Sequence, residues 1–281
     1  MDRLSERARN VSAVCVGLDT AYAYLPEHIK NSGASLSQKI FSFNKAVIDA
    51  TADIACCYKL QSAYYEAMGI EGMCAYAATL GYLKQEGLLS IADVKRSDIA
   101  DTAKMYAQAI FDGDFEADMA TLNAYMGSDT IEPFGPYLEK GKAVFVLVKT
   151  SNPSAVDFEN LDCSGSSLSE MVASKVGEWG EMHVGESGFS SVGAVIGINR
   201  SEDAARLLER MPRAFLLIPG YGAQGGSGAM LESIFRNGIC GVVNASRSVI
   251  CAHLKQGLDR GFERAARSAA SAMQEDVCKW Q

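Results

Sequence analysis

Residues 88–98 have the sequence Leu88-Leu89-Ser90-Ile91-Ala92-Asp93-Val94-Lys95-Arg96-Ser97-Asp98, a short apolar run that ends in a cluster of charges. The apolar run predicts a buried strand. Asp93 and Lys95 are two residues apart, so on a strand they point to the same face, where charges are costly to bury without compensation. A helical pattern resumes at Ile99 and puts Asp98 at or near a helix N-cap. The charges therefore lie where α/β folds hold their chemistry, although an exposed turn with ordinary charges is the alternative.

Similar strand-like runs alternate with helix-like patterns along the whole chain. Eight such runs cover residues 13–19, 54–61, 88–95, 117–123, 143–150, 192–198, 214–219 and 241–246. Helical patterns between them include residues 70–85, 99–111, 168–179, 204–211 and 230–236. Eight strand–helix units predict an α/β fold, a single (β/α)₈ TIM barrel. A doubly wound sheet is the alternative, but no change in composition marks the second domain that would favour it.

The barrel is expected to occupy residues 1–281 as one domain. Within its C-terminal part, about 256–281, residues 258–279 predict a long amphipathic helix that closes the barrel or continues into a linker. The longest irregular stretch, residues 152–166, follows a predicted strand and so lies on the same rim as Lys95. This position predicts a mobile loop over a site, with a plain surface insertion as the alternative.

Composition limits the classes of function. The formal net charge of -8 argues against nucleic acid as a non-specific partner. The 8 cysteines lack C-x-x-C spacing, which is typical of reduced, mostly buried thiols in a cytosolic protein. The 3 histidines show no metal-binding spacing, so no metal site is expected. The charged N-terminus lacks a signal core and no apolar run is long enough for a bilayer, so we expect a soluble cytoplasmic enzyme without a membrane partner.

A glycine-rich loop follows the seventh predicted strand, with the sequence Gly220-Tyr221-Gly222-Ala223-Gln224-Gly225. It matches G-x-G-x-x-G, but the dinucleotide-binding motif belongs after a first strand and needs an acidic residue about 20 residues later. In a barrel, the loops after strands seven and eight usually bind phosphate. Glycine N–H groups, the Gln224 amide and the Arg247 guanidinium would suit a phosphate dianion. A glycine loop that serves only as a tight turn is the alternative.

The segment Asp93–Ile99 resembles the D-x-K-x-x-D-I active-site signature of the orotidine 5′-phosphate decarboxylase family. Further segments resemble the bacterial-type, second subgroup of that family: Phe43-Asn44-Lys45, Tyr58-Lys59-Leu60-Gln61-Ser62-Ala63, Tyr125-Met126-Gly127-Ser128-Asp129, Lys149-Thr150-Ser151-Asn152-Pro153 and Ile218-Pro219-Gly220-Tyr221-Gly222-Ala223-Gln224-Gly225-Gly226. The resemblance extends in order from Val14 to Ile250. It implies a TIM barrel that converts orotidine 5′-phosphate to UMP without a cofactor, as the last step of pyrimidine synthesis.

The resemblance also implies roles for the charged residues. Lys95 would protonate C6 of the pyrimidine as carbon dioxide leaves, and Lys59, Asp93 and Asp98 would complete an alternating Lys–Asp–Lys–Asp array. A preorganised ammonium can stabilise carbanion character at C6 without solvent reorganisation. In the family, the second aspartate of the motif and the Ile and Thr after it come from the partner subunit. Asp98, Ile99 and Thr102 would therefore complete the site of the other chain in a homodimer.

Residues that bind the substrate are implied in the same way. Asp19 would bind a ribose hydroxyl beside Lys59, and Ser151 would contact the pyrimidine. Gln224 and Arg247 would bind the phosphate, with Pro219 and Ser246 also next to the substrate. Some family members are fused to orotate phosphoribosyltransferase as a bifunctional UMP synthase, so this barrel is expected either alone or beside that enzyme.

Three positions depart from the subgroup. Ser97 replaces its usual glycine, and Leu60 and Ala124 stand where proline is common. None of these three residues is charged or contacts the substrate in the implied mechanism. We therefore expect altered loop geometry and retained activity.

Two other functions compete with this reading of the motifs. Magnesium-dependent sugar-phosphate decarboxylases and aldol-type synthases of the same barrel superfamily share D-x-K-x-x-D, but the cation of Lys59 would repel their metal ion. A catalytically silent barrel that binds a nucleotide is the other alternative. It would have no need of all four residues of the charged array.

Overall fold

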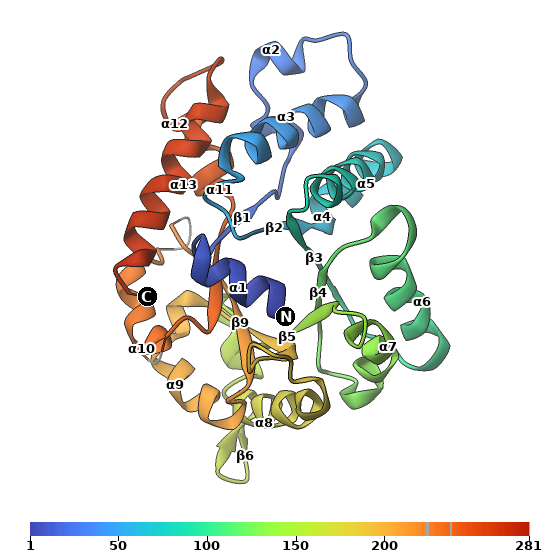
Figure 1. The fold of residues 1–281 in the computed structure, drawn as a ribbon, viewed down its shortest axis with the longest axis vertical. Helices are drawn as coiled ribbons and strands as arrows, with labels where there is room; N and C mark the ends of the chain where they lie inside the picture. Colours follow the sequence, from blue (N-terminus) through green and yellow to red (C-terminus); the bar gives the residue numbers. More distant parts are fainter. Residues whose placement is uncertain (223–224, 237, 281) are drawn as a thin grey trace.

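Within the residues that the structure describes, 1–222, 225–236 and 238–280, eight parallel strands form a closed barrel in the computed structural model (Figure 1). The barrel strands are β1 (Val14–Gly17), β2 (Cys57–Gln61), β3 (Leu89–Arg96), β4 (Met119–Leu122), β5 (Ala143–Lys149), β8 (Ser190–Ile196), β9 (Ala214–Pro219) and β10 (Gly241–Ala245). They follow one another around the ring in chain order, and β10 pairs with β1 to close it. The predicted TIM barrel is confirmed, and the doubly wound sheet is wrong.

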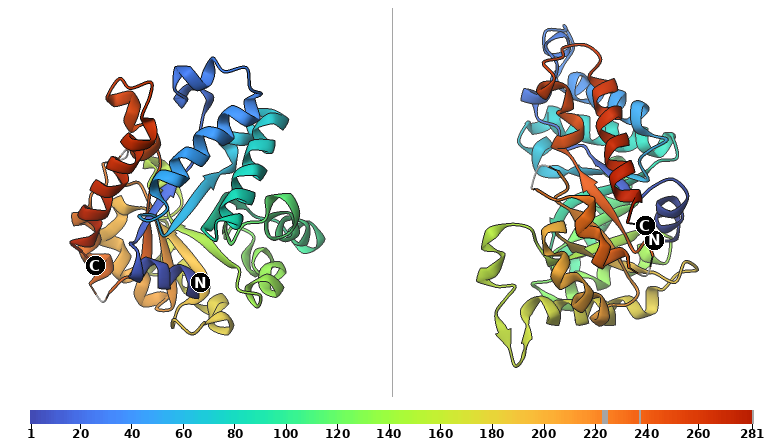
Figure 2. Two further views of the ribbon diagram at one scale, coloured as in Figure 1. Left: turned by 45° about the horizontal axis from the view of Figure 1, so that its top comes forward. Right: turned by 90° about the vertical axis from the view of Figure 1, so that its left-hand side faces the viewer.

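Helices surround the barrel and connect its strands (Figures 1 and 2). They are α1 (Asp2–Asn10), α2 (Glu27–Lys30), α3 (Leu36–Thr51), α4 (Ser62–Glu66), α5 (Gly69–Gln85), α6 (Ala100–Phe111), α7 (Gly135–Leu138), α8 (Leu168–Gly180), α9 (Ser201–Arg210), α10 (Glu232–Phe235), α11 (Arg247–Ile250), α12 (Ala252–Lys255) and α13 (Phe262–Cys278). Four of the predicted helices match α5, α6, α8 and α9, and the predicted C-terminal helix matches α13. The one predicted at 230–236 is a 3₁₀ turn, Gly228–Leu231, followed by the short α10.

Alternation along the strands separates two apolar cores. One set of side chains, which includes Cys57, Leu89 and Ile91, fills the inside of the barrel, while Tyr58 and Leu60 pack outward against the helices. Each fully buried large apolar side chain contributes roughly 1.5–3 kcal/mol. Because Lys59 and Asp93 share the inward direction with Cys57 and Ile91, they face the barrel axis at the carboxyl ends of β2 and β3.

The N-terminal helix α1 closes the opposite end of the barrel, with Leu4 buried in the interior core. Its Arg7 donates from Nε to the carbonyl of Cys56 at 2.9 Å and from Nη2 to the carbonyl of Ala55 at 3.1 Å. The Asp2 carboxylate accepts the Ser187 hydroxyl at 2.6 Å. With this end closed, the carboxyl ends of the strands form the accessible face of the barrel.

The stretch predicted to be irregular is partly structured. It contains a 3₁₀ turn, Pro153–Asp157, and a small antiparallel hairpin of β6 (Asp162–Cys163) and β7 (Ser166–Ser167), which projects from the body of the protein (Figures 1 and 2). Its predicted motion stays a prediction.

The cysteines are free thiols, as expected, but only Cys15, Cys56, Cys57 and Cys251 are buried. The expectation of mostly buried thiols was therefore too strong. No helix in the described part of the chain is long and apolar enough to cross a bilayer.

Candidate active site

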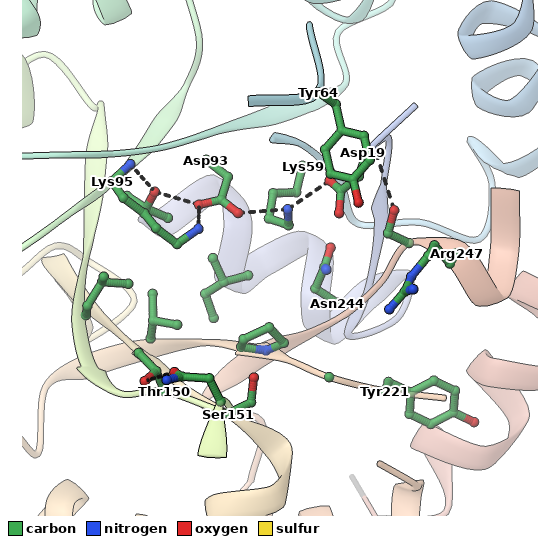
Figure 3. Close-up of a pocket in the computed structure, with 18 residues that line it drawn as sticks. Asp19, Lys59, Tyr64, Asp93, Lys95, Thr150, Ser151, Tyr221, Asn244 and Arg247 are labelled. Carbon is green, nitrogen blue, oxygen red and sulfur yellow. Dashed lines mark hydrogen bonds and ion pairs between the residues drawn. The ribbon is translucent and has the colours of Figure 1, made fainter. Parts of the chain in front are cut away.

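A cavity of about 470 Å³ opens at the carboxyl ends of the barrel strands (Figure 3). Its lining residues are Asp19, Lys59, Tyr64, Asp93, Lys95, Thr121, Leu147, Thr150, Ser151, Asn152, Val195, Leu217, Pro219, Gly220, Tyr221, Asn244, Ser246 and Arg247. Eight of the residues predicted for the site are among them: Asp19, Lys59, Asp93, Lys95, Ser151, Pro219, Ser246 and Arg247.

Four charged side chains form one continuous row in this cavity (Figure 3). Lys59 Nζ donates to Asp19 Oδ1 at 3.1 Å and to Asp93 Oδ2 at 2.9 Å. Lys95 Nζ donates to the other oxygen of Asp93, Oδ1, at 2.6 Å. The row therefore runs Asp19–Lys59–Asp93–Lys95, and alternating charge compensates each member by direct contact.

Strand register brings these residues together. Gly17 pairs with Lys59 between β1 and β2, and Gln61 pairs with Asp93 between β2 and β3. Asp93 is therefore two residues further toward the carboxyl end of its strand than Ile91, the residue that pairs with Lys59. At this position its carboxylate lies within reach of the Lys59 ammonium. The Gln61 amide also donates to Asp93 Oδ2, at 3.1 Å.

The backbone at Lys95 departs from regular strand geometry. Its φ is 47°, in the left-handed region, and the pairing of β3 with β4 shifts register between Ala92 and Arg96. Such a conformation costs a non-glycine residue roughly 1–2 kcal/mol. Thr121 on β4 stabilises it, because its hydroxyl accepts the Lys95 N–H at 3.0 Å and donates to Asp93 Oδ1 at 2.8 Å. The bulge directs Lys95 Nζ back toward Asp93.

Electrostatics keeps the buried part of the row charged. Burial alone would raise the pKa of Asp93, but the ammonium groups of Lys59 and Lys95 outweigh burial and hold that pKa well below its usual range. Burial would likewise lower the pKa of Lys59, but the carboxylates of Asp19 and Asp93 outweigh it and raise the pKa. Both groups are therefore ionised at neutral pH.

The two lysines differ in access to the cavity. The Lys59 side chain is 5% exposed and lies between two carboxylates, whereas the Lys95 side chain is 43% exposed and contacts one. Lys59 is thus enclosed by its partners, while Lys95 can present its ammonium to a molecule in the cavity.

The opposite side of the cavity is built from the ends of β9 and β10 (Figure 3). Arg247 begins α11 and is exposed, and no carboxylate in the described ranges pairs with it. The Ser246 hydroxyl accepts the Asp19 N–H at 3.3 Å. A Cβ on Gly17 would lie 2.7 Å from the Ser246 Cβ, so glycine at the end of β1 permits this close approach. An exposed guanidinium beside backbone and hydroxyl groups suits an anion.

In the glycine-rich loop, several of the N–H groups that were predicted to suit a phosphate donate to backbone carbonyls instead. Gly220 lines the cavity, but the N–H of Gly222 donates to the Gly226 carbonyl at 2.9 Å, and the N–H of Gly226 donates to the Gly220 carbonyl at 3.3 Å. The Gly225 N–H is also used inside the loop, at 3.0 Å from the Gly222 carbonyl. These three N–H groups are therefore hydrogen-bonded to backbone carbonyls of the loop, and phosphate binding by glycine N–H groups stays a prediction. Gln224 lies outside the described residues.

Comparison with known proteins agrees with this geometry. Residues 12–256 match the family described as "Orotidine 5'-phosphate decarboxylase / HUMPS family". The orotidine 5′-phosphate decarboxylase of Clostridium perfringens (strain SM101 / Type A) is 45% identical over 278 residues, which cover 98% of this chain and 97% of that protein. The chain belongs to the orotidine 5′-phosphate decarboxylase family. The predicted enzyme class, a decarboxylase of this family, is confirmed.

Solved structures support membership in the decarboxylase family. The Leishmania donovani OMP decarboxylase superposes with a TM-score of 0.77 at 30% identity, covering 99% of this chain and 96% of that one. The Leishmania donovani UMP synthase gives a TM-score of 0.78 at 33% identity, covering 99% of this chain but 55% of that one.

Three predicted residues of the decarboxylase site do not line the cavity of this single chain. Asp98 is half-buried and its carboxylate accepts the N–H of Ile99 at 2.9 Å. The Ile99 side chain is 49% exposed, and Thr102 is exposed on α6. The helix N-cap is Ile99, one residue after Asp98. The resemblance implied Asp98 as the fourth member of the charged array, but within one chain the fourth member of the row is Asp19.

Several polar residues of the decarboxylase cavity escaped the sequence analysis. They are Tyr64, Thr121, Thr150, Asn152, Tyr221 and Asn244, together with Gln61, which does not line the cavity but bonds to Asp93. Most lie at or just after the end of a predicted strand, which was the one available signal. Within the described ranges, no group of three or more His, Cys, Asp or Glu side chains has the arrangement of a metal site.

Proposed function

We propose that this protein decarboxylates orotidine 5′-phosphate to UMP in pyrimidine synthesis, without a cofactor, and that Lys95 protonates C6. The observation that carries the proposal is the difference between the two lysines. Lys59 is enclosed by Asp19 and Asp93, whereas Lys95 combines a single bond to Asp93 with a side chain 43% exposed toward the cavity. Of these two lysines, Lys95 is the one that has both a fixed ammonium and access to a bound substrate.

The chemical step balances with these groups alone. The bond between C6 and the carboxylate breaks, carbon dioxide leaves, and the electron pair remains at C6. A proton from Lys95 Nζ forms the new C–H bond, and solvent later reprotonates the amine. Asp93 supports this step by holding the ammonium in place before charge develops at C6, so little reorganisation is needed.

The remaining cavity residues would hold the nucleotide around this centre. Asp19 and Lys59 would bind the ribose, Ser151 the pyrimidine, and Arg247 with Ser246 the phosphate, next to Pro219. Gln224 is proposed as a further phosphate ligand on the resemblance alone. Phosphate binding far from C6 contributes to catalysis if it favours a closed, productive site.

The functional unit is proposed to be a homodimer with shared sites. Asp98, Ile99 and Thr102 do not line the cavity of their own chain, and Ile99 and Thr102 are exposed, so they are accessible to a second chain. Two exposed apolar residues near them in the chain, Met105 on α6 at 59% and Tyr125 after β4 at 91%, support an interface there.

Three further assignments belong to the proposal. We place the chain in the bacterial-type, second subgroup because of the motifs at residues 43–45, 58–63, 125–129, 149–153 and 218–226. We place it in the cytoplasm. We also infer that it works beside an orotate phosphoribosyltransferase, fused or associated, since the chain covers 55% of the Leishmania donovani UMP synthase chain. Co-purification of phosphoribosyltransferase activity with this protein from its native cell tests that inference.

The first experiment follows the absorbance of orotidine 5′-phosphate after addition of the purified protein, with and without excess EDTA. Fast turnover that EDTA does not change is expected, because the ammonium of Lys59 lies between Asp19 and Asp93, where a metal ion would meet like charge. Turnover that requires added magnesium would contradict the metal-free reaction. No turnover in either condition would favour magnesium-dependent sugar phosphates or a silent nucleotide-binding barrel.

Shared sites are tested by mixing two inactive variants, Lys95→Ala and Asp98→Ala. A mixed dimer would contain one site with both residues intact, so partial recovery of activity is expected. No recovery, in samples shown by mass spectrometry to exchange subunits, would contradict a shared site.

A further inference from the structure

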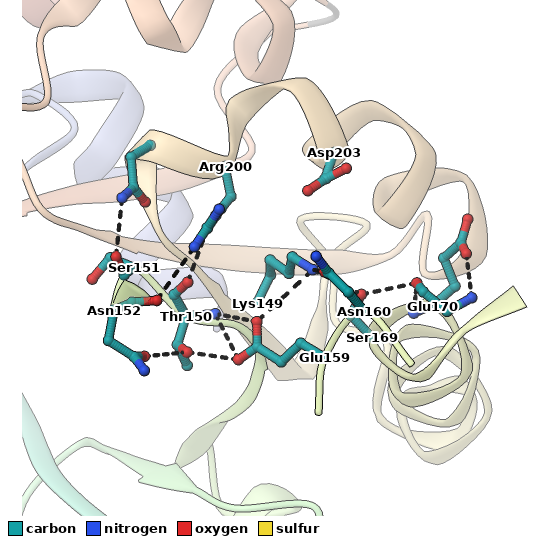
Figure 4. Close-up of polar contacts among 12 residues, drawn as sticks. Lys149, Thr150, Ser151, Asn152, Glu159, Asn160, Ser169, Glu170, Arg200 and Asp203 are labelled. Carbon is teal, nitrogen blue, oxygen red and sulfur yellow. Dashed lines mark hydrogen bonds and ion pairs between the residues drawn. The ribbon is translucent and has the colours of Figure 1, made fainter. Parts of the chain in front are cut away.

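Three residues that follow β5, Thr150, Ser151 and Asn152, form one wall of the cavity (Figure 4). They belong to no strand, yet side chains from other segments bind their backbone groups. The partners are Glu159 from the following loop and residues 199–200 from the loop after β8. This wall is therefore held from behind by groups that do not line the cavity.

Glu159 binds the first residue of the wall at three places. The Thr150 N–H donates to Glu159 Oε1 at 3.0 Å and Oε2 at 3.1 Å, and its hydroxyl donates to Oε1 at 2.6 Å. Hydrogen bonds to a carboxylate are shorter and stronger than neutral ones. The Glu159 side chain is 18% exposed, so water competes little for it.

All three carbonyl groups of the wall accept hydrogen bonds from the loop after β8. Arg200 donates from Nε to the Thr150 carbonyl at 3.2 Å and from Nη2 to the Asn152 carbonyl at 3.3 Å. Asn199 Nδ2 donates to the Ser151 carbonyl at 3.0 Å. The planar guanidinium spans two carbonyl groups at once, which an ammonium cannot do with the same geometry.

A buried lysine supports Glu159. The Lys149 side chain is 4% exposed, its Nζ lies 3.9 Å from Glu159 Oε2, and it donates to the Ser169 hydroxyl at 3.4 Å as well as to Asn160. This positive charge compensates a carboxylate that is otherwise costly to enclose. The hydrogen bond from Lys149 to Ser169 also joins the end of β5 to the start of α8.

We propose that Glu159 and Arg200 are positioning residues that hold Thr150–Asn152 so that Ser151 meets the pyrimidine ring in one orientation. The inference rests on the proposed function, and it adds two residues that touch no substrate in that proposal. A Cβ on Gly197 would lie 2.9 Å from the Ser151 Cβ, so the two loops already pack directly and leave Ser151 little freedom. Among the described residues, the Glu159 and Arg200 side chains bond to this wall and to Lys149, and neither bonds to Ser246 or Arg247. Their loss should therefore affect recognition of the base and leave recognition of the phosphate unchanged.

The test compares two ligands that differ in the base. UMP and ribose 5-phosphate are titrated calorimetrically into wild type, Glu159→Gln and Arg200→Lys. In both variants the affinity for UMP should fall about tenfold while that for ribose 5-phosphate stays unchanged, because a lost charged hydrogen bond loosens the wall alone. With orotidine 5′-phosphate, KM should rise more than kcat falls.

Asp157→Asn is the matched control, since this exposed carboxylate lies on the same loop and makes no side-chain bond in the described part of the chain. It should behave as wild type with both ligands. Equal loss of affinity for both ligands, or no loss for either, would overturn the inference. A wild type that binds UMP but does not consume orotidine 5′-phosphate would contradict the proposed function, while the two titrations would still decide the role of Glu159 and Arg200.

Discussion

The two ends of the cavity are held in different ways. At one end, Lys59, Asp93 and Lys95 come from adjacent strands and bond to one another directly. At the other end, Arg247 is exposed, and Tyr221 follows β9 and donates its hydroxyl to Asp276 on the C-terminal helix α13. Strand register fixes the first end, and a remote helix supports the second.

This difference predicts separate consequences for substitution. Removing a member of the charged row leaves a buried partner without compensation, so it should affect both the stability of the fold and the chemical step. Removing a group at the loop end leaves mostly solvated neighbours, so it should reduce substrate affinity with little effect on folding. The following variants test that separation.

Lys95→Ala should have the largest effect on turnover, a loss of roughly 10²–10⁴-fold in kcat, because it removes the proposed proton donor. UMP should still bind, since Asp19, Arg247 and the pyrimidine wall remain. Single-turnover kinetics measures the loss, and calorimetry with UMP measures the retained binding. Lys84→Ala on α5, where the side chain is 66% exposed, is the matched control and should retain full activity. Near-normal turnover by Lys95→Ala would remove this residue from the mechanism.

Asp93→Asn should be the most destabilising of these variants, by about 3 kcal/mol, because it leaves the ammonium of Lys59 buried with one carboxylate. Its pH dependence has a definite sign. The folded pKa of Asp93 is lowered, so its stabilisation is present above the unfolded pKa of about 3.9 and is lost as the pH falls below it. The folded pKa of Lys59 is raised, so its contribution is present below the unfolded pKa of about 10.4 and is lost as the pH rises through the folded value.

Urea unfolding of wild type and Asp93→Asn across the pH range measures both limbs. The variant should lose less stability than wild type below about pH 4, because the titrating carboxyl is gone. If the free energy of unfolding falls equally in the two proteins as the pH drops below about 4, Asp93 does not couple folding to protonation.

Arg247→Ala should raise KM for orotidine 5′-phosphate by roughly 10–100-fold, since a guanidinium–phosphate contact is a strong charged hydrogen bond. Binding of the nucleoside orotidine, which lacks the phosphate, should not change. Thermal unfolding should also stay close to that of wild type. Equal weakening of nucleotide and nucleoside would contradict a phosphate role for this residue, and a large loss of stability would contradict the proposed difference between the two ends.

The sequence was sufficient for the strands and for the charged centre, because each signal there is local. Alternating or continuous apolar runs located all the barrel strands, and the D-x-K spacing located Asp93 and Lys95 on one of them. Thr121 and Gln61 were not identified, because a neutral side chain at a strand end has no distinctive pattern until the register is known.

Other contacts were out of reach because irregular segments and separate elements make them. Glu159 bonds to Thr150 across 9 positions inside a loop, and Asp276 bonds to Tyr221 across 55 positions between a loop and a helix. The sequence period of a helix or a strand does not predict contacts between such pairs. Likewise, the motif could not show that Asp19, rather than Asp98, completes the charged row within one chain.

The smallest effect is expected for Asp276, which contacts the glycine-rich loop at Tyr221 and the following 3₁₀ turn at Gly228. Its Oδ2 accepts the Tyr221 hydroxyl at 2.9 Å and the Gly228 N–H at 2.7 Å. Asp276→Asn keeps the shape but replaces a charged acceptor with a neutral one, so KM for orotidine 5′-phosphate should rise about threefold with kcat unchanged. Tyr221→Phe should have a similar effect, and the double variant should be no worse than either single one, because both remove the same contact.

If the effects of Asp276→Asn and Tyr221→Phe on KM add fully in the double variant, Tyr221 acts on the substrate independently of α13. The loop end of the cavity would then need no support from a remote helix, as the charged row needs none. A fall in kcat without a change in KM would also contradict the support role, since a remote anchor for phosphate binding should not alter the proton transfer itself. Coupling between Asp276 and Tyr221 would instead mean that α13 holds the glycine-rich loop at the loop end of the cavity.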